Sequence, residues 1–282
     1  MMKLKFSKMH GTGNDYIYVN GFTQPLENPS ELAIKLSDRH FAIGSDGLII
    51  VAPSKVADVR MIMYNADGSE GKMCGNGIRC VAKYAFDHKL TDKTVMTIET
   101  ASGIKTIEVT LDENQKVEYA MVDMGKAILN PKEIPMNVSG ENFIAKEIEV
   151  NGKTYQATAV SMGNPHLVIF TEGIDALDLD KIGPDFEQHE WFPEKVNTEF
   201  VEILDEHNFK MRVYERGSGE TMSCGTGTCA VTVAAVLNGY AKYDEEVNIH
   251  IRGGILKDTY KEDGTVIMKG MATHVFDGEI EV

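Results

Sequence analysis

The segment Met73-Cys74-Gly75-Asn76-Gly77 has a second version, Ser223-Cys224-Gly225-Thr226-Gly227, in the other half of the chain. The two cysteines lie 150 positions apart (224 − 74). The same offset relates further identical residues, namely Met61 and Met211, Tyr64 and Tyr214, Glu70 and Glu220, Val81 and Val231, and the pairs Gly13-Asn14 and Gly163-Asn164. Identities at one fixed offset indicate an internal duplication. The sequence therefore predicts two copies of one domain, each presenting a cysteine at a glycine-rich turn.

The composition of the chain fits this organisation and narrows its function. A length of 282 residues suits two domains of about 140 residues, and 43% hydrophobic residues can fill two cores. A net charge of −15 argues against a nucleic-acid partner, because phosphate binding needs clustered Lys and Arg. We find neither a signal peptide nor an apolar run of membrane-spanning length. Four cysteines in so long a chain do not indicate a disulfide scaffold, so we expect a cytoplasmic, reducing location.

The apolar patterning predicts mostly strands, with one helix after each of the two repeated cysteines. We expect these helices at about 75–88 and 226–238, the second buried all round, and a third from Asn28-Pro29 to about Asp38. Strands are expected near 4–9, 16–19, 48–51, 59–64, 94–100, 104–110, 117–122, 143–150, 154–160, 166–170, 198–204, 209–215, 246–251, 255–260, 264–269 and 274–281.

The predicted fold class is α/β of the α+β type, with two pseudo-symmetric domains. Each domain is expected to be a strongly curved, mostly antiparallel sheet wrapped round a central helix. The half that carries Cys74 is predicted to span 1–122 plus 271–282, and the half that carries Cys224 to span 123–270.

The repeated segment places a cysteine at the N-terminus of a helix, and this position determines the chemistry available to the thiol. The positive end of the helix lowers the pKa of a thiol. The first-turn N–H groups can bind an anion such as a carboxylate. Two such copies, related by a pseudo-twofold axis, would set Cys74 and Cys224 on opposite sides of one bound carboxylate. Inverting the adjacent carbon needs a base on one face and an acid on the other. No metal or cofactor is required.

The other two cysteines, Cys80 and Cys229, break the symmetry and lie inside the expected helices. We therefore interpret them as small buried hydrophobes. Zinc needs four converging ligands, and the cysteine spacings here are not those of a zinc site. A thioredoxin-like motif is also absent.

Six motifs resemble diaminopimelate epimerase, and the resemblance runs from Met9 to the C-terminus. They are Gly-Thr-Gly-Asn-Asp-Tyr (11–16), Tyr-Asn-Ala-Asp-Gly (64–68), Met-Cys-Gly-Asn-Gly-Ile-Arg-Cys (73–80), Gly-Asn-Pro-His (163–166), Tyr-Glu-Arg-Gly (214–217) and Ser-Cys-Gly-Thr-Gly-Thr (223–228).

The resemblance implies a cofactor-independent two-base epimerase that interconverts LL- and meso-diaminopimelate in lysine and peptidoglycan-precursor biosynthesis. It implies that Cys74 and Cys224 are the acid/base pair, one as thiolate while the other is thiol. It also implies a small-molecule substrate, a homodimer and a cytoplasmic location, with no nucleic-acid or membrane partner.

The substrate carries an amino-acid group at each end, so the protein must also recognise the end that it does not invert. We assign Glu215 to a substrate ammonium and Arg216 to a carboxylate, which a guanidinium can hold at two points. His166 and Glu215 are expected to adjust the thiol pKa values. The resemblance and the helix-start geometry add the substrate-binding positions Asn14, Asn65, Gly75, Asn76, Asn164, Asn197, Gly225 and Thr226.

One position departs from the family and two alternatives stay open. Gly47, which the 150 offset pairs with Asn197, stands where some members carry Gln, so any contact from that side chain is missing.

A proline racemase or hydroxyproline epimerase would share the chemistry, but these tend to carry His where this chain has Asn76, and they need no counterpart of Arg216. A thiol-redox or metal-binding protein would instead retain metal or hold a stable Cys74–Cys224 disulfide.

Overall fold

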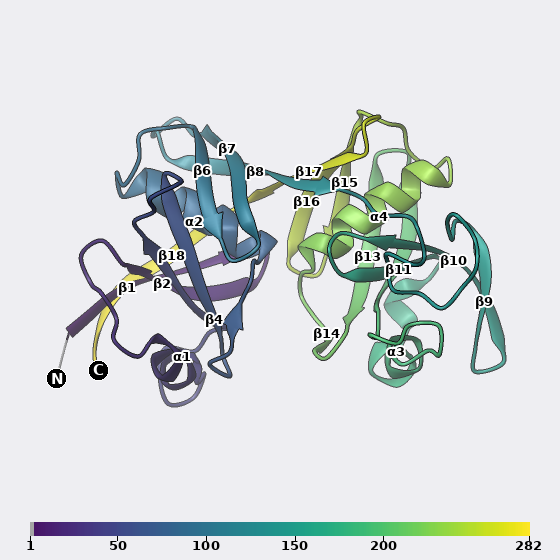
Figure 1. The fold of residues 1–282 in the computed structure, drawn as a ribbon, viewed down its shortest axis with the longest axis horizontal. Helices are drawn as coiled ribbons and strands as arrows, with labels where there is room; N and C mark the ends of the chain where they lie inside the picture. Colours follow the sequence, from purple (N-terminus) through teal and green to yellow (C-terminus); the bar gives the residue numbers. More distant parts are fainter. Residues whose placement is uncertain (1–2) are drawn as a thin grey trace. The chain divides into compact units, whose positions relative to one another are not determined.

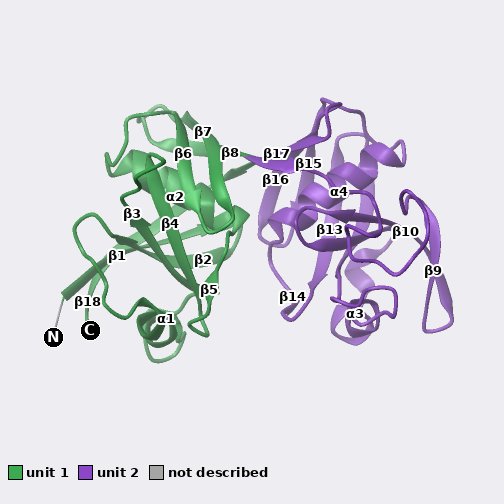
Figure 2. Cartoon of the chain, in the orientation of Figure 1, with its two compact units in different colours: residues 1–122, 269–282 green, residues 123–268 purple. Residues whose placement is uncertain are grey.

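The computed structural model describes residues 3–282, and the chain divides into two compact units. Unit 1 comprises residues 1–122 and 269–282, and unit 2 comprises residues 123–268 (Figure 2). The chain therefore passes between the units twice. Among the helices of the described residues, none has the length and apolar character needed to cross a bilayer.

Unit 1 is one mixed sheet in which neighbouring strands are mostly antiparallel (Figure 1). The parallel neighbours are β2 with β3 and β4 with β6. A two-residue strand, β5 (Glu70–Gly71), adds to β4 just before the cysteine. The order across the sheet is β18 (Thr273–Glu281), β1 (Lys3–Gly11), β2 (Asn14–Asn20), β3 (Gly47–Ala52), β4 (Val59–Asn65), β6 (Val95–Thr100), β7 (Gly103–Leu111) and β8 (Val117–Lys126).

Unit 2 repeats this order with the same two kinds of parallel neighbours, β11 with β12 and β13 with β15. Strand β14 (Gly219–Glu220) adds to β13 as β5 does to β4. A turn after β16 leads into β17 (Thr265–Met271). The order is β9 (Lys146–Val150), β10 (Lys153–Ser161), β11 (Pro165–Phe170), β12 (Asn197–Asp205), β13 (Asn208–Glu215), β15 (Glu246–Ile251) and β16 (Gly254–Tyr260).

The duplication is visible in the helices, whose bounds differ by 150 at both ends. Helix α1 (Pro29–Ser37) corresponds to α3 (Leu179–Glu187), and α2 (Gly75–Asp87) corresponds to α4 (Gly225–Leu237). Helix α2 packs against strands from β1 across to β7, and α4 packs against strands from β10 across to β16. A sheet whose distant strands all touch one helix must curve round it. The predicted fold class, a curved sheet round a central helix in each half, is confirmed.

Helix α4 is buried along nearly its whole length, as its apolar and small residues predicted. The prediction for α1 is right in position. Asn28 occupies the N-cap, yet its side chain makes no capping hydrogen bond. The helix is held instead by packing, because Ala33 and Leu36 are fully buried in a cluster with Leu4 and Ile17.

Helix α3 was not predicted, and neither were the short strands β5 and β14 or the 3-10 turn η1 (Ile174–Ala176). Gly183 and Pro184 lie inside α3, and both residue types disfavour a helix. Tertiary contacts override this propensity. Leu179 and Phe186 are buried in the core of unit 2, and Asp178 caps the helix by accepting a hydrogen bond from the amide of Lys181 at 3.3 Å.

We expect Gly183→Ala to lower the free energy of unfolding by roughly 1–3 kcal/mol through overpacking. A Cβ at this position would lie 2.2 Å from Cδ2 of Tyr214, so the helix or the ring must shift. Urea denaturation of both proteins measures the difference. Lys181→Ala, an exposed change on the same helix, is the control and should stay within about 0.5 kcal/mol. An increase in stability, as helix propensity alone would give, contradicts the packing argument.

Candidate active site

Each of the two repeated cysteines occupies the N-cap of the central helix of its unit. Cys74 and Cys224 both have extended backbone angles there, and each side chain accepts a hydrogen bond from the third residue of its helix. The amide of Gly77 donates to Sγ of Cys74 at 3.3 Å, and the amide of Gly227 donates to Sγ of Cys224 at 3.3 Å. Both sulfurs therefore lie at the positive end of a helix, an environment that stabilises a thiolate.

Cys74 is half-buried and lies against an amide that is held in one orientation. Its thiol donates to Oδ1 of Asn14 at 3.2 Å. The amide nitrogen of Asn14 donates to Asp46 at 2.7 Å, and Arg39 pairs with Asp46 at 2.8 Å. This chain of contacts turns the oxygen of Asn14 toward the cysteine.

The other predicted positions of unit 1 surround the start of α2. Asn76 is buried, and its Oδ1 accepts from the hydroxyl of Thr12 at 3.4 Å. The carbonyl of Gly75 accepts from the buried guanidinium of Arg79 at 3.2 Å. Asn65 lies at the end of β4, where its amide donates to the hydroxyl of Ser69 at 2.9 Å.

Cys224 lies in a more enclosed and more negatively charged environment than Cys74. Its side chain is only 4% exposed. Burial, and then the carboxylates of Glu215 and Glu199, raise the pKa of the Cys224 thiol well above its usual value. Burial also raises the pKa of Glu215, whose carboxylate accepts from Thr221 and interacts with the thiol. Thr226 lies beside the sulfur, with its Oγ1 3.6 Å from Sγ.

His166 is fully buried at the same place and is fixed at both ring nitrogens. Its Nδ1 lies 2.6 Å from Oε1 of Glu199, and its Nε2 lies 3.2 Å from Oδ1 of Asn164. Asn164 in turn donates from its amide nitrogen to Thr226 at 3.3 Å. His166, Glu199 and Cys224 thus form one buried cluster against the start of α4.

The ligand atoms of this cluster lie within 4.8 Å of one another, so the cluster is also a candidate metal group among residues 3–282. Two ligands on one tetrahedral zinc stand roughly 3.4 Å apart, given bonds of about 2.0–2.1 Å. The nitrogen of His166 and the oxygen of Glu199 are 2.6 Å apart, which is the distance of a charge-assisted hydrogen bond. The donor set therefore suits a proton-sharing group better than a metal site.

Glu199 is a residue of this site that our sequence reasoning missed. It is fully buried, and its Oε2 has no hydrogen-bond partner among residues 3–282. The signal was present in the duplication, because the 150 offset pairs Glu199 with Ile49. Unit 2 thus has a buried carboxylate where unit 1 has a buried apolar residue. Packing alone does not explain a carboxylate at such a position.

Asn197 and Arg216 are joined to each other at the end of β12 and β13. Oδ1 of Asn197 accepts from the backbone amide of Arg216 at 3.0 Å, and its amide nitrogen donates to the carbonyl of Pro165 at 3.0 Å. The guanidinium of Arg216 donates to the carbonyl of Glu194 at 2.9 Å. Adjacent residues of opposite charge, such as Glu215 and Arg216, would by themselves suggest a solvated ion pair. Among the described residues, Arg216 forms no ion pair with Glu215.

The two half-sites share a backbone frame but differ in chemistry. Unit 2 places ionisable side chains where unit 1 has uncharged ones. At the 150 offset these pairs are His166 with Tyr16, Glu199 with Ile49, Glu215 with Asn65, and Arg216 with Ala66. Cys224 therefore has charged neighbours that Cys74 lacks.

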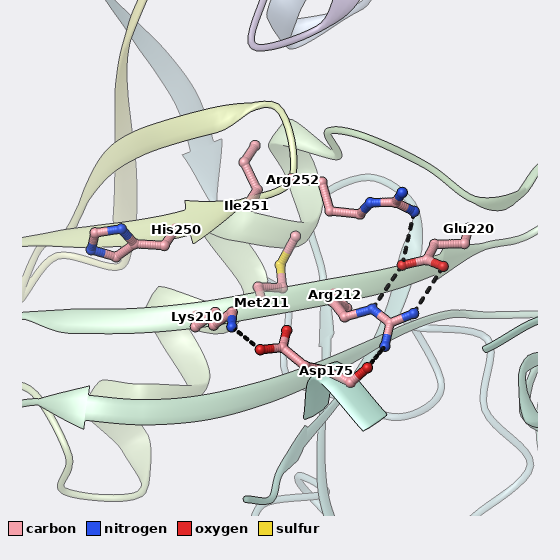
Figure 3. Close-up of a pocket in the computed structure, with 8 residues that line it drawn as sticks. All are labelled: Asp175, Lys210, Met211, Arg212, Glu220, His250, Ile251 and Arg252. Carbon is pink, nitrogen blue, oxygen red and sulfur yellow. Dashed lines mark hydrogen bonds and ion pairs between the residues drawn. The ribbon is translucent and has the colours of Figure 1, made fainter. Parts of the chain in front are cut away.

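A pocket of about 370 Å³ on unit 2 contains none of the predicted site residues (Figure 3). Its cations are already paired. The guanidinium of Arg212 contacts both carboxylate oxygens of Glu220 at 2.8 and 3.0 Å, Arg252 reaches the same carboxylate at 3.3 Å, and Lys210 pairs with Asp175. These pairs connect β13 to its neighbours, and we assign the pocket no ligand.

Comparison with known proteins gives a consistent result. The chain matches the family model described as diaminopimelate epimerase over residues 6–129 and 158–275. It is 53% identical over 283 residues to the diaminopimelate epimerase of Desulfovibrio desulfuricans, covering 98% of each chain.

Two solved structures share the fold at low identity. A Bacillus anthracis phenazine biosynthesis protein of the PhzF family has a TM-score of 0.69 at 18% identity, covering 100% of both chains. A hydroxyproline epimerase from Agrobacterium vitis has a TM-score of 0.68 at 12% identity, covering 99% of this chain and 91% of its own.

We expect iodoacetamide to alkylate Cys74 at least about tenfold faster than Cys224 near pH 8, because only the thiolate reacts. Cys224 is buried and its pKa is raised, whereas Cys74 is half-exposed. Cys80, with a pKa raised to about 11 by burial, and the fully buried Cys229 should remain unmodified. Peptide mass spectrometry over time measures the order.

The same reaction in urea is the control, because unfolding should make the four cysteines react at similar rates. Modification of Cys224 before Cys74 in the folded protein would contradict the difference between the half-sites.

Proposed function

The chain belongs to the diaminopimelate epimerase family, and we propose that its Cys74 and Cys224 act as the acid and base of the reaction. The enzyme is an isomerase of lysine biosynthesis that interconverts LL-2,6-diaminopimelate and meso-diaminopimelate. The observation that carries the two-thiol mechanism is the matched capping geometry. In both units a glycine amide donates to the cysteine sulfur at 3.3 Å at the start of the central helix.

In this mechanism one thiolate removes the α-proton from the substrate and becomes a thiol. The electron pair left on the α-carbon delocalises into the neighbouring carboxylate. The other thiol then delivers its proton to the opposite face of the same carbon and becomes a thiolate. Each turnover exchanges the protonation states of Cys74 and Cys224, so no other reactant is consumed.

The helix starts supply the electrostatic part of the mechanism. First-turn amides have no carbonyl within the helix to which they can donate, so they bind anions. We assign the first-turn residues Gly75, Asn76, Gly225 and Thr226 to the carboxylate of the reacting centre. Their dipoles stabilise the charge that develops there in the transition state.

The difference between the half-sites supports an order for the first proton transfer. The pKa of Cys224 is raised by burial and by two carboxylates, so it enters the cycle as the thiol. Cys74 then enters as the base for one substrate isomer, and the two cysteines exchange these roles for the other isomer. His166, held between Glu199 and Asn164, lies in the cluster with Cys224, and we assign it to adjust the reactivity of that thiol.

Recognition of the distal end of the substrate is assigned to the remaining residues. Arg216 uses one guanidinium nitrogen on Glu194, which leaves its other nitrogens to hold a carboxylate. Glu215 is assigned both to the substrate ammonium and to Cys224, and its contact with the thiol supports the second role. Asn14, Asn65 and Asn197 lie at strand ends and Asn164 lies just before β11, and we assign all four as amide donors to the substrate.

We expect LL-diaminopimelate in D2O, with reductant and no added cofactor, to take up deuterium at one α-carbon and to form the meso isomer. Cys74→Ala and Cys224→Ala should each lower turnover by at least about a thousandfold, because each removes one proton-transfer group. Proton NMR and chiral chromatography measure exchange and product. Cys80→Ala and Cys229→Ala are matched controls that should affect stability more than turnover.

The alternatives give different results in the same assay. Exchange on proline with none on diaminopimelate would move the enzyme to the proline racemase type. Near-normal turnover in either catalytic variant, or activity that survives a confirmed Cys74–Cys224 disulfide, would contradict the two-thiol mechanism. Inactivation by that disulfide and recovery with reductant is the expected outcome.

We also propose that the enzyme works as a cytoplasmic homodimer. The mechanism needs both thiols reduced, and the cytoplasm keeps thiols in that state. Light scattering after size-exclusion chromatography should give twice the chain mass of 31.2 kDa. A mass of one chain at working concentration would rule out the dimer.

A further inference from the structure

We propose that Tyr16 is the positioning residue of Cys74, with its hydroxyl donating a hydrogen bond to the sulfur, and that it is the unit 1 counterpart of His166. The inference rests on the proposed catalytic role of Cys74. It concerns a residue of the chain that the sequence motifs contained but to which no role was assigned.

The position of Tyr16 in the duplication supports the pairing. Tyr16 and His166 are 150 residues apart, and each stands two residues after its duplicated asparagine, Asn14 or Asn164. Both are buried on equivalent strands, β2 and β11. Both strands run parallel to the next strand in their sheets, with a register difference of 31 residues in each unit (48 − 17 and 197 − 166). The two side chains therefore leave the same place in the repeated fold.

The contacts of Tyr16 match those of His166 within the two half-sites. The ring of His166 bonds Asn164 and belongs to the cluster with Cys224. Asn14 and Cys74 are both among the side chains that act on the hydroxyl of Tyr16. Burial first, and then the nearby Cys74 and Asp46, raise the pKa of Tyr16 far above its usual value. The phenol accordingly keeps its proton near neutral pH and can act as a donor.

A donor beside Cys74 complements the acceptor that is already there. When Cys74 is a thiol, it donates to Oδ1 of Asn14 at 3.2 Å. When Cys74 is a thiolate, it needs donors, and the amide of Gly77 at 3.3 Å is one. Tyr16 supplies a second donor. The two-base mechanism requires both protonation states in each cycle, and Asn14 together with Tyr16 serves both.

The absence of a side chain at Gly47 is what admits the tyrosine ring. A Cβ on Gly47 would lie 2.9 Å from Cε1 of Tyr16 and 2.1 Å from the carbonyl oxygen of Tyr64. A longer side chain there would collide with the ring. Gly47 is the counterpart of Asn197, so unit 1 has no side chain on β3 at the place where unit 2 has an amide. This accounts physically for the departure at Gly47 noted in the sequence.

The test compares Tyr16→Phe with Tyr18→Phe, which is the same change two residues along the same strand. Tyr18 is equally buried, but its hydroxyl lies 3.4 Å from the carbonyl of Gly77 and bonds Cys80, which has no catalytic role. Tyr16→Phe should move the pH midpoint of Cys74 alkylation by iodoacetamide upward by about one pH unit, the effect of losing one hydrogen bond to a charged group. It should lower kcat about tenfold and change KM by less than about twofold. Tyr18→Phe should leave the midpoint and kcat near their wild-type values.

Four results separate this proposal from the proposed function and from a purely structural role. An unchanged midpoint and kcat in Tyr16→Phe would overturn the role of Tyr16, even if Cys74→Ala is inactive. Equal midpoint shifts in both Phe variants would show a general loosening of β2 and would also overturn it. Tyr16→His, which places the ring of unit 2 in unit 1 and keeps a donor, should recover part of the lost kcat; no recovery would contradict the hydrogen bond. Full activity of Cys74→Ala would instead remove the proposed function itself.

Discussion

The hydrogen bond from a helix amide to a cysteine sulfur, made once in each unit, is the interaction on which the candidate site depends. It needs the third residue of the helix to come very close to the strand below. A Cβ at Gly77 would lie 2.9 Å from Cδ1 of Ile49, and one at Gly227 would lie 2.8 Å from Oε1 of Glu199. A side chain at either position would force these neighbouring side chains to move. The approach presses the positive end of the helix against the sheet, so the sulfur, the helix dipole and the strand residues are fixed together.

The duplication supplies two equivalent thiols, and the divergence of the copies makes them unequal. Cys224 is enclosed with His166, Glu199 and Glu215, and its pKa is raised. Cys74 stands among uncharged hydrogen-bonding groups, Asn14 and Tyr16. A reaction that runs in both directions needs two groups that exchange roles, but a resting enzyme needs one thiol and one thiolate. In the proposed mechanism, similar backbones with different neighbours meet both needs.

Much of the fold could be predicted because it is written in local patterns. Alternating apolar residues predicted most of the long strands, and the repeated cysteine segment predicted a helix after each cysteine. The sequence reasoning failed where local signals conflict with packing. Helix α3 contains Gly183 and Pro184, and only the burial of Leu179 and Phe186 makes it a helix. Asn28 had the residue type of a cap, but the packing of Ala33 and Leu36 holds that helix in its place.

The sequence by itself determined the family, the duplicated frame and the positions of the two repeated cysteines, because these depend on residue types at fixed spacing. The tertiary structure decided the surroundings of each sulfur. Glu199 lies 25 residues before Cys224 in the chain (224 − 199), and Tyr16 lies 58 residues before Cys74 (74 − 16). Neither separation indicates contact. The parallel neighbours β11–β12 and β2–β3 bring these side chains beside the helix start, and burial there gives a carboxylate or a phenol its effect on a thiol.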